Sequence, residues 1–268
     1  MPGSRSAVAV GLAVLAASLY ATTPAYAAAP SNDDFDSATV ATALPFSDTT
    51  STVEATQAPD DPSCGGGGSV WYAFTPSADT WVEANTNGSD FDTMLGAYTG
   101  QRGALAPVGC NDDSRYGFAS AVDFLATAGT TYHFMVDGFF GQTGTVVFNL
   151  VVVPAPLTSV TVQAASTGTV NRQGLVTVHG TITCDQAGQA YIQVRAVQSN
   201  RRFTSAGDGY TESACGPTAT GWSATVKDYD GPSFVPGKVT LTYFAYAENE
   251  TGSAYTEGGR TVTLVGVR

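Results

Sequence analysis

Basic residues are scarce in this chain. Its 268 residues hold 11 Lys and Arg against 23 Asp and Glu, which gives a formal net charge of −12. The imbalance is concentrated in residues 28–156, where fifteen acidic residues face only Arg102 and Arg115. Recognition of phosphate needs a basic footprint, so this charge argues against nucleic acid as a partner. An acidic surface keeps an exported protein soluble, and it is also the surface that a cation site needs.

Histidine and catalytic motifs are equally sparse. The only histidines are His133 and His179, each inside an apparent strand and in different halves of the chain. Neither has a paired Ser, Cys or Asp motif, and no G-x-S-x-G, H-E-x-x-H, P-loop or dinucleotide fingerprint is present. We therefore expect no enzymatic activity. An unrecognised hydrolase is the minor alternative, because paired carboxylates such as Asp90 and Asp92 also serve glycosidases.

Long apolar runs are missing except near the N-terminus. The run Ala7–Leu19 has thirteen residues, too few to span a bilayer. It follows Arg5 and precedes Ala25-Tyr-Ala27, which has the small-x-small pattern of a cleavage site. The sequence predicts a secretory signal peptide over residues 1–27, and hence a secreted protein without a membrane span in the mature chain.

Charge and cysteine both divide the remaining chain in two. Residues 28–156 carry a net charge of −13, whereas residues 157–268 hold eight acidic and eight basic residues. Together with the prolines of Pro154-Ala-Pro156, this predicts two domains, 28–156 and 157–268.

The four cysteines fall evenly between these domains, with Cys64 and Cys110 in the first and Cys184 and Cys215 in the second. Export favours disulfides, and one of the three connectivities keeps each bridge within a domain. Zinc is the alternative, but it lacks any C-x-x-C or Cys/His spacing.

Helical periodicity of any length is absent, and short strands separated by Gly-rich turns take its place. Residues 121–126 and 131–137 alternate with period two, which gives each strand one inward face. We expect strands in the first domain at 39–46, 70–75, 81–86, 93–99, 105–108, 121–126, 131–137 and 145–153. Gly100–Gly103 reads as a turn, and Asp60–Gly68 as a loop tethered by its cysteine. This pattern predicts a β-sandwich.

The second domain continues the β character. Strands are expected at 160–164, 175–183, 190–197, 223–227, 238–247 and 260–267. About seven strands in this length fit an immunoglobulin-like sandwich with Cys184–Cys215 as its inter-sheet bridge, although Trp222 does not follow the antibody spacing. Arg201-Arg-Phe203 is too short for a basic patch and reads as a solvated hairpin tip.

Several motifs of the first domain resemble the bacterial pre-peptidase C-terminal (PPC) domain. They occur in order over roughly Asn32–Val153: Asn32–Phe35, Gly68–Pro76, Ser89–Leu95, Cys110–Asp113 and Ala128–Gly138. The resemblance implies a jelly-roll β-sandwich appended to secreted hydrolases, which serves substrate contact, secretion or stability and is not itself catalytic. The second domain is similar to a domain of unknown function in secreted actinomycete proteins, through Val176–Cys184, Cys215 and Gly221–Val226.

Calcium is the one cofactor that the acidic residues suggest. Carboxylate and amide oxygens converge in sequence on two short stretches, and the candidate ligands are Asp90, Asp92, Asn111, Asp112 and Asp113. Ordinary turn chemistry also favours these residue types. Collagen-binding relatives of the PPC domain bind calcium through a lead-in that Asn32–Asp34 match, and through an acidic loop where this chain has Gly65–Gly68 instead.

Aromatic residues in loop-like sequence form the second candidate site. They are Tyr116, Phe118, Phe139 and Phe140. Such rings stack on sugars or anchor a protein partner, unless they simply cap the core. The sequence therefore favours a secreted, non-catalytic binding or accessory protein that contacts an extracellular polysaccharide or protein, with calcium as a candidate cofactor. The alternative is a structural or cell-envelope-associated protein without a discrete ligand.

Overall fold

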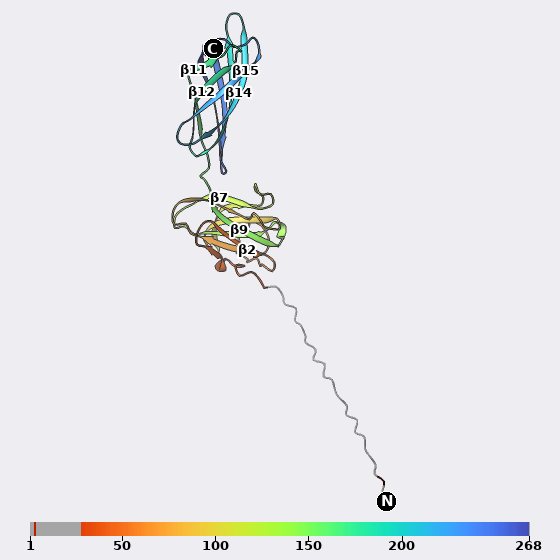
Figure 1. Cartoon of the computed structure of the whole chain (residues 1–268). Coiled ribbons are helices and arrows are strands. Elements are labelled where there is room, and N and C mark those ends of the chain that lie inside the picture. The colour runs from red at the N-terminus through yellow and green to blue at the C-terminus, as the bar shows by residue number, and fades with distance from the viewer. Residues whose placement is uncertain (1–2, 4–27, 268) are drawn as a thin grey trace.

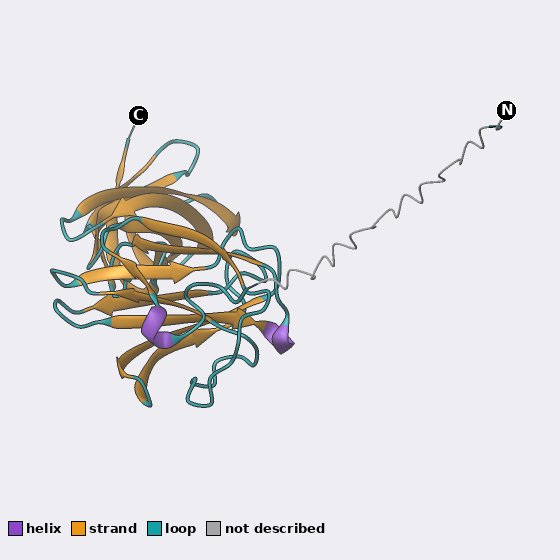
Figure 2. Cartoon of the chain, turned by 90° about the horizontal axis from the view of Figure 1, so that it is seen from below, coloured by secondary structure: helices purple, strands orange, loops and turns teal. Residues whose placement is uncertain are grey.

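A computed structural model describes Gly3 and residues 28–267, so the predicted signal peptide lies outside the described residues apart from Gly3. The chain is all-β, as the sequence predicts, and its strands dominate the fold (Figure 2). The described helical structure consists of two single 3₁₀ turns, η1 (Phe35–Ser37) and η2 (Phe139–Gly141). Among residues 28–267, no helix has the length and apolar character needed to cross a membrane.

The first domain is a jelly roll of two facing sheets. Four strands form one sheet in the order β2 (Phe46–Ser51), β9 (Thr145–Val152), β4 (Thr80–Asn85) and β7 (Ala121–Ala126). The other sheet has the order β1 (Thr39–Ala41), β3 (Val70–Phe74), β8 (Tyr132–Gly138), β5 (Thr93–Gln101) and β6 (Ala104–Asn111). The eight strands from β2 to β9 follow the jelly-roll order, and β1 adds a parallel edge strand beside β3.

The alternation along each strand explains where the core lies. On β8, Tyr132, Phe134 and Val136 point between the sheets, and Phe134 packs 5.4 Å from the Phe148 ring of β9. Tyr72 of β3 stacks on the same ring at 4.0 Å. The apolar residues of period two therefore come from both sheets to build one buried layer.

A second layer covers the outer face of the five-stranded sheet. Trp71, Tyr98 and Met135 point outward but are buried. The N-terminal lead-in, here residues 30–38, and the β2–β3 loop lie across them. Phe35 of η1 packs edge-on against Trp71 at 5.2 Å. The disulfide Cys64–Cys110 ties this loop to β6, which is the predicted pairing.

The second domain is an immunoglobulin-like sandwich whose edges close into a barrel-like sheet. Its strands are β10 (Val160–Ala164), β11 (Thr167–Val170), β12 (Val176–Cys184), β13 (Gly188–Ser199), β14 (Thr204–Cys215), β15 (Thr220–Asp230), β16 (Gly237–Glu248) and β17 (Ser253–Gly266). They pair in the order β10-β12-β11-β17-β16-β13-β14-β15, and β15 also pairs with β12. Figure 1 labels β11, β12, β14 and β15 of this domain. The predicted bridge Cys184–Cys215 is present, and it joins β12 to β14.

The sequence did not predict two strands of the second domain, β11 and β14. Strand β11 has four residues, and β14 is rich in Gly, Ser and Thr, so neither shows strong apolar alternation. Both are held by their neighbours, since β14 pairs along its full length with β13. In the first domain, the single weak segment expected at 39–46 is instead the two strands β1 and β2. The hairpin tip at Arg201-Arg-Phe203 is where the sequence places it, with both arginines exposed.

The two domains have separate cores. One buried cluster contains only residues between Leu157 and Leu264, whereas the other two lie entirely before Val151. The linker between the two cores contains Ala155, and Asn249 fixes it to the second domain. The Asn249 side chain donates to Ala155 O at 2.8 Å and accepts from Leu157 N at 3.3 Å.

Candidate functional site

The loops at one end of the jelly roll bring the candidate residues together. Three connections meet there: β4–β5, β6–β7 and β8–β9. Backbone hydrogen bonds join them, because Thr93 N donates to Phe118 O at 3.2 Å and Phe139 N donates to Asp92 O at 2.9 Å. Residues as far apart in the chain as Asn87 and Gln142 therefore share one rim, as antiparallel topology requires of alternate connections.

An open hollow of about 670 Å³ lies in this rim. Its walls come from the β4–β5 and β6–β7 loops, with Gln142 contributed by the β8–β9 connection. Four of the nine candidate ligand residues line it: Asp90, Asp92, Tyr116 and Phe118. We call it the acidic–aromatic hollow. Its size falls within the range of small-ligand sites in proteins.

The acidic residues hold different positions around this hollow. Asp90 is exposed and caps the neighbouring strand, since its Oδ1 accepts from Thr145 N at 2.7 Å. The backbone bends at residues 90–91 and is not an extended strand over 89–92, so the period-two argument for placing Asp90 and Asp92 on one side does not apply. Partial burial raises the pKa of Asp92, and the charges of Asp113 and Asp112 raise it further. The charges of Asp112 and Asp113 are therefore close enough to act on the Asp92 carboxyl.

Some of the candidate calcium oxygens already have protein partners. Asn111 Oδ1 accepts from Ala121 N at 3.1 Å, and Asp112 Oδ1 accepts from Asp113 N at 2.9 Å. Over the described part of the chain, no three or more His, Cys, Asp or Glu residues are grouped closely enough to hold a metal ion. A calcium ion here would depend on Asp92 with Asp112 or Asp113, and on amide and backbone oxygens.

Of the aromatic candidates, Tyr116 is held in place by a hydrogen bond to a buried residue. Its phenol donates to Glu83 Oε1 at 3.0 Å, and Arg115 lies over its ring at 4.9 Å. Glu83 is completely buried on the outer face of β4, where Arg115 forms an ion pair with it. The ring of Tyr116 is thus held in one orientation at the edge of the hollow.

The other three aromatic candidates differ in exposure. Phe118 is 71% exposed and Phe140 is 90% exposed, whereas Phe139 is half-buried with its ring 4.3 Å from that of Phe140. Phe140 also has φ +52°, a left-handed conformation that a bulky residue rarely adopts. A strained backbone that presents a large apolar ring to solvent is typical of a binding element.

Sequence reasoning missed a carboxylate pair beside Tyr116. Asp123 of β7 lies directly opposite Glu83 of β4. Partial burial, followed by the charge of Glu83, raises the pKa of Asp123 to about 6. The alternation in β7 marked Asp123 as outward-facing, but nothing in the sequence showed that Arg115 and Tyr116 fold over its partner.

A second buried acid lies under the four-glycine run. Asp137 of β8 is 1% exposed, and a Cβ at Gly65 would overlap its carboxyl oxygens. Burial raises the pKa of Asp137 to about 7, although a backbone hydrogen bond from Gly66 opposes this. The Tyr98 pKa is also raised, to about 12, by burial and then by the charge of Asp137. The glycines therefore let the loop lie flat against the sheet.

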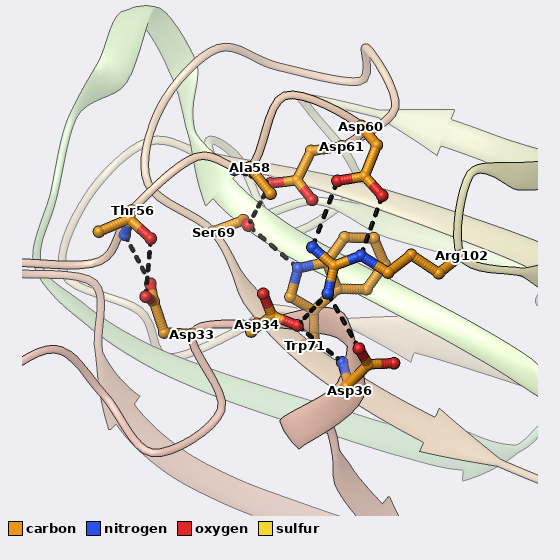
Figure 3. A network of polar contacts seen from close by, with 10 residues as sticks. All are labelled: Asp33, Asp34, Asp36, Thr56, Ala58, Asp60, Asp61, Ser69, Trp71 and Arg102. Carbon is orange, nitrogen blue, oxygen red and sulfur yellow. Dashed lines mark hydrogen bonds and ion pairs between the residues drawn. The ribbon is translucent and has the colours of Figure 1, made fainter.

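The side chains of Asn32, Asp33 and Asp34 already bond to other protein groups, and Figure 3 shows those of Asp33 and Asp34. Asp33 accepts from Thr56 N and Thr56 Oγ1, and Asn32 donates to Trp71 O. Arg102, at the tip of the β5–β6 turn, contacts three carboxylates, at 2.5 Å from Asp34, 3.0 Å from Asp36 and 2.9 Å from Asp60. The guanidinium of Arg102 thus balances the negative charge of these three carboxylates.

No protein-family model matches the sequence, and no curated protein matches it either. Solved structures give distant similarities. A Bacteroides uniformis β-glucuronidase is 9% identical with TM-score 0.22, over 72% of this chain and 27% of that chain. A glycosyl hydrolase family 2 member from Bacteroides cellulosilyticus is 11% identical with TM-score 0.23, over 73% and 30%. A Parabacteroides merdae β-glucuronidase is 11% identical with TM-score 0.23, over 73% and 28%.

The chain spans less than a third of the length of each of these enzymes. At such identities and TM-scores, neither their activity nor their ligands carry over to it. The resemblance to the PPC domain rests on the sequence motifs alone.

Proposed function

We propose that this chain is a secreted, non-catalytic binding protein whose first domain contacts an extracellular polysaccharide. The observation that carries the proposal is the convergence of Tyr116 and Phe118 with Asp90 and Asp92 around one hollow. Aromatic rings stack on the apolar faces of sugar rings, while carboxylates accept hydrogen bonds from hydroxyl groups. Export is part of the proposal, and two disulfides support it because they persist in oxidising surroundings.

The rigidity of the hollow supports a binding role. Tyr116 is fixed by Glu83, and the loops that carry Phe118 and Asp92 are joined by backbone hydrogen bonds. Binding to rings that are already ordered costs less conformational entropy than binding that has to order them. Phe140 adds an exposed ring at the same end of the domain, on the β8–β9 connection, whose Phe139 N donates to Asp92 O.

The test is a pull-down of the disulfide-bonded mature chain with insoluble cellulose, chitin, xylan, starch and collagen. We expect retention by one of the polysaccharides and loss of retention in Phe118→Ala. Leu125→Ala is the matched control, because Leu125 is an exposed apolar residue of β7 outside the hollow. Retention by collagen alone would contradict a polysaccharide ligand and indicate a protein ligand. No retention by any of the polymers would favour the purely structural role.

Calcium and catalysis have separate tests. If calcium binds at Asp92, Asp112 and Asp113, millimolar calcium raises the melting temperature above its value in chelator, and Asp92→Asn removes the difference. Equal melting in both conditions contradicts the calcium part and leaves polysaccharide binding standing. Release of reducing sugar from any of the polysaccharides, lost in Asp92→Asn, would replace the binding role by a hydrolase.

A further inference from the structure

The second domain carries its own patch of exposed aromatic rings. Strands β14, β13, β16 and β17 are neighbours in that order, and every second residue on each strand points away from the core. The registers align these outward residues in three rows across the four strands. The rows are Glu212–Tyr191–Tyr246–Tyr255, Tyr210–Gln193–Phe244–Glu257 and Asp208–Arg195–Thr242–Gly259. We call this surface the aromatic face.

The rings of the aromatic face are open to solvent. Tyr210 is 76% exposed and Tyr255 is 73% exposed, while Tyr191 and Phe244 keep over two fifths of their surface accessible. Two pairs lie nearly parallel: Tyr191 with Tyr246 at 6.5 Å and 28°, and Phe244 with Tyr255 at 6.1 Å and 25°. Large rings gathered in this way on one surface mark an interaction site more often than a chance exposure.

The face is hollowed rather than flat. One hollow of about 510 Å³ lies among Tyr191, Tyr210, Phe244 and Tyr246. A second, of about 580 Å³, lies beside it and is bordered by Arg195, Glu257 and Gly258. Both are also lined by Gln193, Asp208 and Phe244, so Phe244 and its neighbours separate two adjoining depressions.

The side chains that surround these hollows indicate the ligand. None of the twelve positions carries an aliphatic side chain, and Ile192, which also lines the smaller hollow, is buried. Each ring has an amide, carboxylate, hydroxyl or guanidinium group at an adjacent outward position of its own strand or row. The buried core of a protein interface is normally depleted of charged residues, whereas this face carries four: Arg195, Asp208, Glu212 and Glu257. Sugar rings present a flat C–H face together with hydroxyl groups, which suits aromatic rings flanked by hydrogen-bonding side chains.

The charge of the aromatic face narrows the class of polysaccharide further. The three carboxylates Asp208, Glu212 and Glu257 outnumber the single cation Arg195 on this face. Arg195 is itself engaged, because its guanidinium lies 5.7 Å from the Tyr229 ring of β15. Acidic polysaccharides would be repelled here. We propose that the aromatic face is a second carbohydrate-binding site, which takes a neutral polysaccharide along the two adjoining hollows.

This site is independent of the acidic–aromatic hollow, because it lies on the other domain and shares no residue with it. The chain would then hold a polymer at two points. Two linked sites raise the overall avidity without any new contact, provided that both can reach the same polymer.

The experiment uses the full mature chain and affinity electrophoresis in gels that contain soluble cellulose derivative, xylan, glucomannan or mixed-linkage glucan. We expect at least one of these neutral polymers to retard the wild-type chain. Phe244→Ala should weaken that retardation by about tenfold, as should Tyr210→Ala. Val265→Ala is the matched control, because Val265 is an exposed residue of β17 outside the aromatic face. Acidic polymers such as pectate should not retard the chain.

The results for Phe118→Ala and Phe244→Ala together show which of the two proposed sites binds the polymer. Retardation that Phe118→Ala abolishes and Phe244→Ala leaves unchanged overturns this proposal and upholds the first-domain site. Loss in Phe244→Ala with none in Phe118→Ala upholds the aromatic face and contradicts the proposed function of the hollow. A wild-type dimer in analytical ultracentrifugation that Phe244→Ala dissociates, without retardation by any neutral polymer, overturns the proposal in favour of a second copy of this chain.

Discussion

Arg102 holds Asp60 through two parallel hydrogen bonds, from Nε at 2.9 Å and from Nη2 at 3.3 Å. The remaining guanidinium nitrogen, Nη1, reaches Asp34 and Asp36 on the lead-in. One side chain thus connects three segments: the N-terminal lead-in, the β2–β3 loop and the β5–β6 turn (Figure 3). The planar fork is what allows this, because a lysine ammonium cannot make paired parallel bonds to a carboxylate.

Replacing Arg102 by lysine should therefore loosen the lead-in without unfolding the domain. The ion pairs are exposed, and exposed pairs add little to global stability. We expect faster hydrogen exchange at the amides of Asp36 and Ala58, and an unchanged rate in the β3 core. Arg201→Lys, at an exposed hairpin tip, is the control. Exchange at Asp36 that matches the wild type would show that Arg102 is not what holds the segment.

Asp137→Asn should stabilise the protein above neutral pH. Burial raises the Asp137 pKa from its ordinary 3.8 to about 7, so the folded chain binds this proton more tightly than the unfolded chain. Stability from this group is therefore present below pH 4 and declines as pH rises towards 7. The charge of Asp61 also raises the pKa of Asp137, and the charge of Asp137 in turn raises the pKa of the neighbouring Tyr98.

For this buried group the gain above pH 7 is up to about 4 kcal/mol. Urea titrations at pH 5 and pH 8 measure it, and the benefit of the asparagine should be larger at pH 8. Asp36→Asn, at an exposed carboxylate, provides the comparison. A benefit that is the same at both pH values would contradict a titrating Asp137.

Gly65→Ala should destabilise the first domain, whereas Gly66→Ala should not. A Cβ at Gly65 meets the Asp137 carboxyl, and Gly65 has φ +143°. Gly66 has open space around its Cβ position and an ordinary φ. We expect a loss of about 1–3 kcal/mol for the first variant and a small gain, roughly 0.4–1 kcal/mol, for the second. Thermal melts of both variants check this, and equal melting temperatures would contradict the close approach of the loop.

Phe140 should show a conflict between stability and binding. Its left-handed backbone costs roughly 1–2 kcal/mol for a bulky residue, and asparagine tolerates that conformation better. Phe140→Asn should therefore raise the melting temperature while it weakens retention on the proposed polysaccharide ligand. A variant that is more stable and binds equally well would show that the exposed ring has no part in recognition.

Much of the fold could be predicted from particular residues. Tyr132, Phe134 and Val136 identify the inward face of β8, and the charge change near Pro156 coincides with the passage between the two cores. The distribution of Cys64, Cys110, Cys184 and Cys215 left one pairing within domains, which the structure contains. Strand β14 could not be predicted, because its Gly-Asp-Gly and Thr-Glu-Ser segments have no apolar alternation.

The candidate sites were only partly predictable. The residue types at Asp92, Tyr116 and Phe118 pointed to binding, and the jelly-roll order places their loops at one end. The aromatic face gave no comparable signal, since Tyr191, Phe244 and Tyr255 lie on strands whose alternation reads as ordinary surface. They become a site through cross-strand registers that join residues about 10 to 65 positions apart.

The sequence by itself determined the all-β class, the two domains, the disulfide pairing and the inward face of most strands. These properties depend on residues close in the chain or on simple counting, so local patterns carry them. Only the tertiary structure decided what lies over each outward face: the glycine run over Asp137, Arg115 and Tyr116 over Glu83, and Arg102 among the lead-in carboxylates. A period of two tells which side of a sheet a residue is on, but the layer that covers that side is set by long-range packing of loops.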